Sequence, residues 1–149
     1  MMTAHVLFDA VDPGVPATMS RRALEEILRG ELGFQGVIVS DDLEMKAIAD
    51  HYPLEEAVIR GVLAGVDLFL ICEHPSAQHR AIEALVRAVE SGSVPRRRID
   101  ESVRRLDALT ATFARPAQDG LASLGSAEHR RMSEGLLGWA AGPDPTARS

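Results

Sequence analysis

Composition and charge narrow the function classes open to this chain. Its 149 residues carry a formal net charge of −6, and aromatic residues make up only 4% of them. Nucleic-acid binding relies on basic surfaces and stacking aromatics, so this balance argues against it. The single cysteine, Cys72, excludes an internal disulfide and is typical of a reducing compartment. No segment is apolar enough for a signal or membrane-spanning sequence, which predicts a cytoplasmic protein without membrane contact.

The chain begins with two predicted strand-helix units. The first pairs a strand over residues 4–8 with a helix over 20–32, and Ser20 is placed to cap that helix. The second has an uninterrupted β-branched run, Val37-Ile38-Val39, which is typical of a buried parallel strand. A short helix over about 45–51 follows.

A further helix begins near Pro53, and Ala64-Gly65 ends it. The third unit has a strand over 66–71 and a helix over 76–91. The residues of that helix expected to face inward are Ile82, Leu85, Val86 and Val89.

A last long helix is expected over about 95–114. Its apolar positions, expected inward, are Ile99, Val103, Leu106 and Leu109. Its arginines are expected on a solvated outer face: Arg96, Arg97, Arg98, Arg104 and Arg105. Residues 1–115 therefore form the predicted α/β part, and residues 116–149 a tail with one possible helix over 126–132 and a disordered end.

The most informative feature is the pair Asp41-Asp42, which directly follows the second strand. In parallel α/β folds, ligands bind at the carboxyl ends of the strands, so a carboxylate there is a candidate nucleophile or general base. Aspartate at such a junction is also a favoured helix cap. Two adjacent aspartates allow one to cap and the other to react.

Several short motifs around this pair occur in a recognisable order. They are Met2-Thr3-Ala4-His5-Val6, Asp12-Pro13, Pro16-Ala17-Thr18-Met19-Ser20, Glu31-Leu32-Gly33-Phe34-Gln35-Gly36 and Ser40-Asp41-Asp42-Leu43-Glu44-Met45. In their order and spacing, over roughly residues 2 to 115, they resemble the C-terminal part of the catalytic domain of glycoside hydrolase family 3, the NagZ type of bacterial β-N-acetylhexosaminidase.

The resemblance implies a (β/α)8 TIM barrel, of which this chain covers about the last three βα units. It implies removal of terminal β-linked GlcNAc from muropeptides in cell-wall recycling, with retention of configuration and no cofactor or metal. Asp41 takes the position of the nucleophile, and Asp42 that of a cap or supporting residue. His5 either lines the sugar subsite or is a hydrogen-bonded core histidine, and Met45 is either an apolar wall for the sugar or a helix-packing residue.

The chain also departs from the family pattern. Members carry a Lys-His-Phe-Pro-Gly-His-Gly loop and an Asp-Ser-His stretch that supply the acid/base dyad, and none of the five histidines has that context. A full barrel takes about 250 residues. We therefore expect an inactive fragment of the enzyme, with two alternatives: a truncated remnant, or a non-catalytic α/β domain that binds a partner.

A partial barrel also predicts unpaired edges and self-association. The apolar residues expected to line its open interior are Val6, Phe8, Ile38 and Phe69. Two other signals at the end of the third strand are weaker. Cys72 is expected to be a buried structural thiol, and Glu73, His74 and His79 match no standard metal-ligand spacing.

Overall fold

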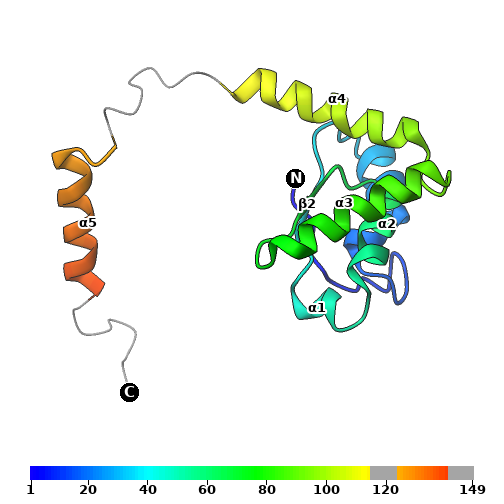
Figure 1. Ribbon diagram of the computed structural model, residues 1–149, viewed down its shortest axis with the longest axis horizontal. Coiled ribbons are helices and arrows are strands. Elements are labelled where there is room, and N and C mark those ends of the chain that lie inside the picture. Colours follow the sequence, from blue (N-terminus) through cyan, green and yellow to red (C-terminus); the bar gives the residue numbers. More distant parts are fainter. Residues whose placement is uncertain (115–123, 141–149) are drawn as a thin grey trace. The chain divides into compact units, whose positions relative to one another are not determined.

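The computed structural model describes residues 1–114 and 124–140. The chain forms two units, Met1–Phe113 and Ala114–Ser149, and each is described by itself. The first unit contains, in chain order, these strands and helices, of which Figure 1 labels α1 to α4 and β2: η1 (Ala17–Met19), η2 (Arg22–Glu31), β1 (Val39–Asp42), α1 (Lys46–Ala49), α2 (Leu54–Ala64), β2 (Leu68–Leu70), α3 (Pro75–Glu90) and α4 (Arg96–Phe113). The second unit contains α5 (Ala127–Ala140).

β1 lies between two parallel neighbours. On one side it pairs with β2, with Val39 opposite Leu68. On the other side the start of the chain runs parallel to it, because Thr3 donates to the Val39 carbonyl at 2.8 Å and Val39 donates to the Met1 carbonyl at 2.9 Å. The predicted parallel α/β arrangement is therefore present.

The strand predicted over residues 4–8 does not form. Pairing with β1 takes place at Met1–Thr3, and Leu7 instead makes an isolated antiparallel bridge to Pro16. Strand propensity alone predicted this strand, whereas a strand also needs a neighbour to accept its hydrogen bonds. Among the described residues, no backbone hydrogen bond joins residues 4–8 to β1, and the Val6 carbonyl accepts the Ala17 N–H instead.

Ile38 and Phe69 face the helices rather than an open interior. Ile38 is fully buried against Leu24 and Leu28 of η2, and Phe69 of β2 packs against all three buried clusters. The expectation that Ile38 and Phe69 line a barrel interior is therefore wrong. Side chains alternate along a strand, so the opposite face carries Val39 and Leu68. Val6 and Phe8 are exposed, as expected.

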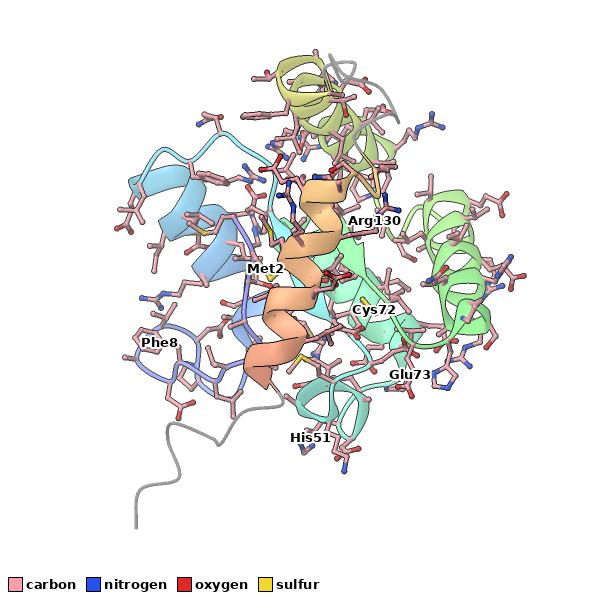
Figure 2. All side chains as sticks on the ribbon, turned by 90° about the vertical axis from the view of Figure 1, so that its left-hand side faces the viewer. Met2, Phe8, His51, Cys72, Glu73 and Arg130 are labelled. Atoms are coloured by element: carbon pink, nitrogen blue, oxygen red, sulfur yellow. The ribbon has the colours of Figure 1, made fainter. Side chains whose placement is uncertain are left out.

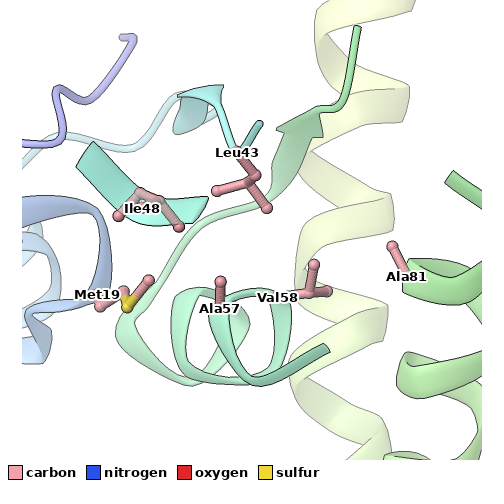
Figure 3. Close-up of a cluster of buried hydrophobic side chains, with 6 residues drawn as sticks. All are labelled: Met19, Leu43, Ile48, Ala57, Val58 and Ala81. Carbon is pink, nitrogen blue, oxygen red and sulfur yellow. The ribbon is translucent and has the colours of Figure 1, made fainter. Parts of the chain in front are cut away.

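Local sequence signals fix the ends of two helices. The Ser20 hydroxyl accepts the Ala23 N–H at 3.1 Å, which confirms Ser20 as the cap of the helical segment that includes η2. Gly65 ends α2 with a φ of 120°, a conformation that disfavours side chains. α2 carries two residues of the cluster drawn in Figure 3, which is made up of Met19, Leu43, Ile48, Ala57, Val58 and Ala81.

The buried face of α3 differs from the predicted one. A stripe of small residues faces inward: Ala77, Ala81, Ala84 and Ala88. Ile82 and Val86, which were expected inward, are 62% and 49% exposed. Small side chains let α3 lie close against α2, so the alanine stripe faces the contact. Leu85 and Val89, also expected inward, are partly buried and pack against the buried clusters.

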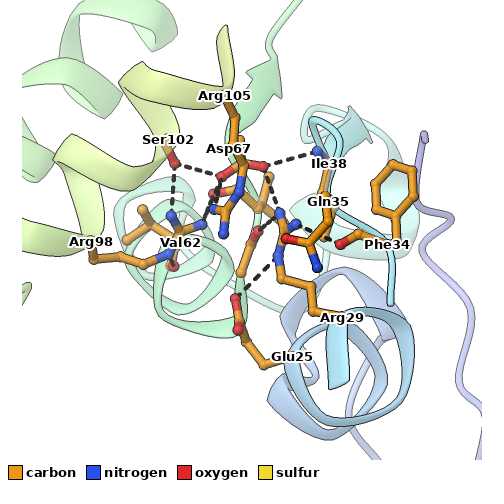
Figure 4. A network of polar contacts seen from close by, with 12 residues as sticks. Glu25, Arg29, Phe34, Gln35, Ile38, Val62, Asp67, Arg98, Ser102 and Arg105 are labelled. Carbon is orange, nitrogen blue, oxygen red and sulfur yellow. Dashed lines mark hydrogen bonds and ion pairs between the residues drawn. The ribbon is translucent and has the colours of Figure 1, made fainter. Parts of the chain in front are cut away.

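The outer face predicted for α4 is also wrong in part. Arg98 is buried and Arg105 is only partly exposed, because both reach Asp67, whose side chain has no exposed surface. Arg29 of η2 joins them at 2.7 Å from Asp67 Oδ2 (Figure 4). Two of the arginines therefore neutralise a buried carboxylate. Arg96, Arg97 and Arg104 remain exposed as expected, whereas Val103 and Leu109, expected inward, are exposed.

The helix predicted in the tail is confirmed and extends further than expected. The Ser126 hydroxyl accepts the His129 N–H at 3.2 Å, as a helix cap does. The disordered end predicted for the chain lies outside the described residues. Within the described part of the chain, every helix is too short or too polar to cross a bilayer.

Replacing Asp67 by asparagine is expected to lower the free energy of unfolding by about 3–5 kcal/mol, since it leaves buried arginines without their counter-charge. Burial opposes ionisation of Asp67, but hydrogen bonds from the Ile38 N–H and Ser102, and the charges of Arg105 and Arg29, hold its pKa below the ordinary value. Its contribution is therefore present above the ordinary pKa and is lost as the pH falls through the lower pKa of the folded state. Urea denaturation at several pH values measures both effects.

The matched control is Asp100→Asn, which removes the surface pair with Arg96. Surface pairs of this kind contribute at most about 1 kcal/mol. Equal losses of stability in the two variants would contradict the central role of Asp67.

Candidate functional site

The carboxylates of Asp41 and Asp42 lie at the carboxyl end of β1 and have different hydrogen-bond partners. Asp41 Oδ1 accepts the N–H of Asp42 at 2.8 Å. Asp42 Oδ1 accepts the N–H of Glu44 at 3.1 Å and the N–H of Cys72 at 3.3 Å. Among the described residues, no hydrogen bond reaches Asp41 Oδ2. We call residues 41–44 the aspartate turn.

Asp42 is therefore not the helix cap that was one of its two expected roles. The cap position of α1 is Met45, which makes no side-chain capping bond. Asp42 instead closes a short turn through the Glu44 N–H, a common use of aspartate. Its other expected role, a residue that supports Asp41, stays a prediction.

His5 holds the aspartate turn from the side of the chain's first residues. Its Nε2 lies 3.0 Å from the Asp42 carbonyl and its Nδ1 lies 2.9 Å from the Thr18 hydroxyl. A carbonyl only accepts, so Nε2 is the protonated donor. The half-buried ring thus bridges the first residues, η1 and the end of β1, as the expected hydrogen-bonded histidine does.

Met45 follows the turn and lies outside the core. Its side chain is 45% exposed. Met45 is therefore not a buried helix-packing residue, and its role beside the sugar stays a prediction. Its apolar surface instead lies on the same edge of the sheet as the two aspartates.

Sequence reasoning missed Glu44. Its Oε2 accepts the N–H groups of Glu73 at 2.6 Å and His74 at 3.2 Å, and its Oε1 lies 2.7 Å from His74 Nδ1. The loop that carries Cys72 and Glu73 is labelled in Figure 2. An acidic residue two positions beyond Asp42 was visible in the sequence, but nothing there pointed to a partner 30 residues away.

Cys72 is exposed, so the expectation of a buried structural thiol is wrong. Its backbone is held by Asp42, which leaves the thiol at the surface of the loop. Desolvation and the nearby carboxylates of Asp42 and Glu44 raise the pKa of Cys72. A raised pKa disfavours the thiolate and a nucleophilic role.

One cluster of possible metal ligands lies in the same loops. Atoms of Glu44, Glu73 and His74 lie within 4.8 Å of one another. His79, considered with them from the sequence, bonds to the Pro75 carbonyl instead. Both oxygens of Glu44 already accept N–H bonds, and the other two side chains are exposed, so loop fastening accounts for the cluster.

Two cavities lie near the aspartate turn, and one of them is lined by residues of the turn itself. One, of ≈ 690 Å³, is lined by Glu44, His74 and Arg80 among others. The other, of ≈ 440 Å³, is lined by His5 and His51. Both contain Tyr52, whose ring carries the Arg60 guanidinium 5.4 Å above it. The first cavity therefore adjoins the turn directly, and the second adjoins His5, whose ring contacts the Asp42 carbonyl.

Replacing Asp42 by alanine is expected to lower the free energy of unfolding by about 1–3 kcal/mol, because the N–H groups of Glu44 and Cys72 lose their acceptor. Chemical denaturation measures this loss. The matched control is Asp107→Ala on the exposed face of α4, which is expected to change stability by less than about 0.5 kcal/mol. Equal effects would contradict the role assigned to Asp42.

Comparison with known proteins now identifies the family. Residues 1–109 match the glycosyl hydrolase family 3 N terminal domain. A beta-hexosaminidase of Alkalilimnicola ehrlichii is 49% identical over 77 residues, which are 52% of this chain and 22% of the relative. One of Bordetella avium is 34% identical over 137 residues, which are 92% of this chain and 36% of the relative.

Solved structures agree. The family 3 β-N-acetylglucosaminidase of Paenibacillus sp. str. FPU-7 is 43% identical, with a TM-score of 0.76 over 91% of this chain and 27% of that one. The β-N-acetylglucosaminidase of Thermotoga maritima is 32% identical, with a TM-score of 0.71 over 76% of this chain and 25% of that one. The chain thus spans between 22% and 36% of the two hexosaminidases above, and it belongs to glycosyl hydrolase family 3.

Proposed function

We propose that this chain is a segment of a retaining exo-β-N-acetylglucosaminidase and that Asp41 is its nucleophile. The observation that carries the proposal is that the two carboxylates of the aspartate turn differ in their hydrogen bonds. The Asp42 side chain is used by two loop N–H groups, whereas Asp41 keeps one oxygen without a hydrogen bond among the described residues. The names of the relatives support the substrate class.

The chemistry follows from a carboxylate in this position. Asp41 attacks the anomeric carbon while the bond to the leaving oxygen breaks and a general acid protonates that oxygen. The sugar is then held as an ester of Asp41. Water, deprotonated by the same acid/base group, displaces the carboxylate and releases the sugar with its original configuration.

His5 and Met45 are proposed to line the sugar subsite beside Asp41. His5 is fixed by Thr18 and by the Asp42 carbonyl, so it would contact a sugar through its ring edge while holding the turn. Met45 offers an exposed apolar surface that a sugar ring can pack against. Asp42 supports Asp41 by holding the turn closed.

The rest of the active site is proposed to come from other segments. Three parallel extended segments with helices packed on one face fit about the last three units of a (β/α)8 barrel. The general acid and the groups that grip the sugar hydroxyls would lie on the remaining units. The preference for peptidoglycan fragments, and with it a role in cell-wall recycling, rests on the motif resemblance.

A chimera tests this proposal. The 137 residues of this chain that match the Bordetella avium beta-hexosaminidase replace their counterparts in that protein. The chimera is expected to hydrolyse an aryl N-acetyl-β-glucosaminide and to be labelled on Asp41 by a slow-turnover fluorinated sugar. The isolated chain is expected to be inactive, since general acid assistance alone contributes roughly 10²- to 10⁴-fold.

Within the chimera, Asp41→Asn is expected to lower turnover by several orders of magnitude and to abolish labelling. Asp42→Asn is the matched control and is expected to keep the label on Asp41. Label on Asp42, or full activity in Asp41→Asn, would reverse the assignment. Robust turnover by the isolated chain would show that the acid is present within it.

A non-catalytic role remains the second candidate, because no histidine of this chain has the context of the family's acid/base dyad. It takes two forms. The chain is either an inactive remnant or a domain that binds a partner through its open edges.

We also propose that the isolated chain self-associates through those edges. Leu68 on β2 is 40% exposed at the open side of the sheet. Leu68→Lys is expected to reduce association in analytical ultracentrifugation. Leu63→Lys on α2, where the side chain is 42% exposed, is the matched control and should not. A monodisperse wild-type monomer with a sharp cooperative melt would contradict the proposal.

A further inference from the structure

The loop between β2 and α3 is fastened to the aspartate turn by side chains of that turn. Asp42 accepts the Cys72 N–H, and Glu44 accepts the N–H groups of Glu73 and His74. Two carboxylates of the aspartate turn therefore accept hydrogen bonds from three consecutive N–H groups of the loop between β2 and α3. The backbones of the two segments meet once nearby, where Leu43 donates to the Leu70 carbonyl at 3.0 Å.

Glu44 is suited to this contact in charge and length. Its side chain is only 13% exposed, so its charge depends on the donors around it. The carboxylate has two oxygens, and each of them has a donor on the opposite loop. Aspartate is one methylene shorter, and glutamine would present an N–H₂ group where one of these oxygens lies.

We propose that Glu44 is a positioning residue for Asp41, acting by fastening the residue 72–74 loop onto the aspartate turn, and that protonation of His74 strengthens the fastening. The proposal rests on the function proposed above for Asp41. Asp42 and Glu44 reach the same loop from either end of the turn, so release of that loop frees both. Asp41 would then lose the fixed backbone that aims its carboxylate.

The charged groups around His74 set the direction of its pH dependence. The hydrogen bond to Glu44 and the charge of Glu73, 4.0 Å away, raise the pKa of His74, while burial and Arg80 of α3 oppose this. Arg80 is itself paired with Glu55 of α2 at 3.0 Å. The stabilisation from His74 is fully present below its ordinary pKa of about 6.5 and is lost as the pH rises through the folded value.

Glu44 titrates in the opposite sense. Burial opposes its ionisation, but the N–H groups of Glu73 and His74 lower its pKa. Its contribution is present above its ordinary pKa and is lost as the pH falls through the lower folded value. The fastening is therefore strongest in the pH range between the folded pKa values of Glu44 and His74.

Hydrogen exchange followed by mass spectrometry tests the proposal on the full 149-residue chain, and it tolerates self-association. Amide exchange is followed in peptides covering residues 41–45 and 71–75, and exchange at the imidazole C2 position reports the pKa of His74. Glu44→Ala is expected to accelerate amide exchange in both peptides roughly 10- to 100-fold, the range for loss of a hydrogen bond to a charged group.

Two further variants separate charge from contact. Glu44→Gln keeps one acceptor oxygen, so it is expected to retain part of the amide protection while the pKa of His74 returns toward its ordinary value. Glu73→Gln is the matched control, since the Glu73 carboxylate accepts no backbone N–H in the fastening and is exposed. At a pH below the ordinary pKa of His74 it is expected to leave both peptides protected, while the pKa of His74 itself falls because the Glu73 charge contributes to raising it. Unchanged exchange in α4 peptides shows that the effects are local.

Unchanged exchange in the 41–45 peptide of Glu44→Ala would overturn the proposal, even if the 71–75 peptide responds, because Glu44 would then hold only its own partner loop. A His74 pKa unaffected by Glu44→Gln would overturn the pH dependence. The proposed function is decided separately. An inactive chimera contradicts the role of Asp41 and leaves the exchange result standing, whereas an active chimera labelled equally fast with Glu44→Ala contradicts the positioning role alone.

Discussion

The arrangement of the strands depends on one buried carboxylate. Asp67 accepts the Ile38 N–H at 3.0 Å, and its own N–H reaches the Ile38 carbonyl at 2.8 Å. The residue before β1 and the residue before β2 are thereby locked side by side. Arg29 and Arg98 bring η2 and α4 onto the same group (Figure 4). A buried charge is stable only when it is paired and fully hydrogen-bonded, so these elements take their places together.

The register between β1 and β2 that is set at Asp67 determines how Asp41 and Asp42 are placed at the carboxyl end of β1. Val39 is opposite Leu68 and Asp42 is opposite Leu70, so three steps along β1 match two along β2. Such an irregularity bends a strand and re-aims its side chains. Simple alternation along β1 therefore does not assign the directions of Asp41 and Asp42, and their hydrogen bonds distinguish them instead. Ser40 supports the irregular stretch by accepting the Leu70 N–H at 3.0 Å.

Signals that act within a few residues were predictable from the sequence, and contacts between distant segments were not. Three helix ends lie where they were expected, at Ser20, Gly65 and Ser126, because a cap needs only its own neighbours in the chain. Arg98 was expected on a solvated face, because helical periodicity cannot reveal a carboxylate 31 positions away. The aspartate pair was predictable from the strand that precedes it. The loop that fastens it was not.

A carboxylate holds each end of the sheet: Asp67 at one end is buried, whereas Glu44 at the other has an exposed partner. This difference decides which end can respond to pH. The Asp67 side chain has no exposed surface, and the hydrogen bonds and arginines around it hold its pKa below the ordinary value. Around Glu44 the partner His74 is 62% exposed, and the hydrogen bond to Glu44 raises the pKa of His74 above its ordinary value. Local opening is easiest where hydrogen bonds are exposed and apolar contacts few. The end of the sheet at Asp67 is therefore rigid, and the part of the site that can change with pH is the residue 72–74 loop that Glu44 holds.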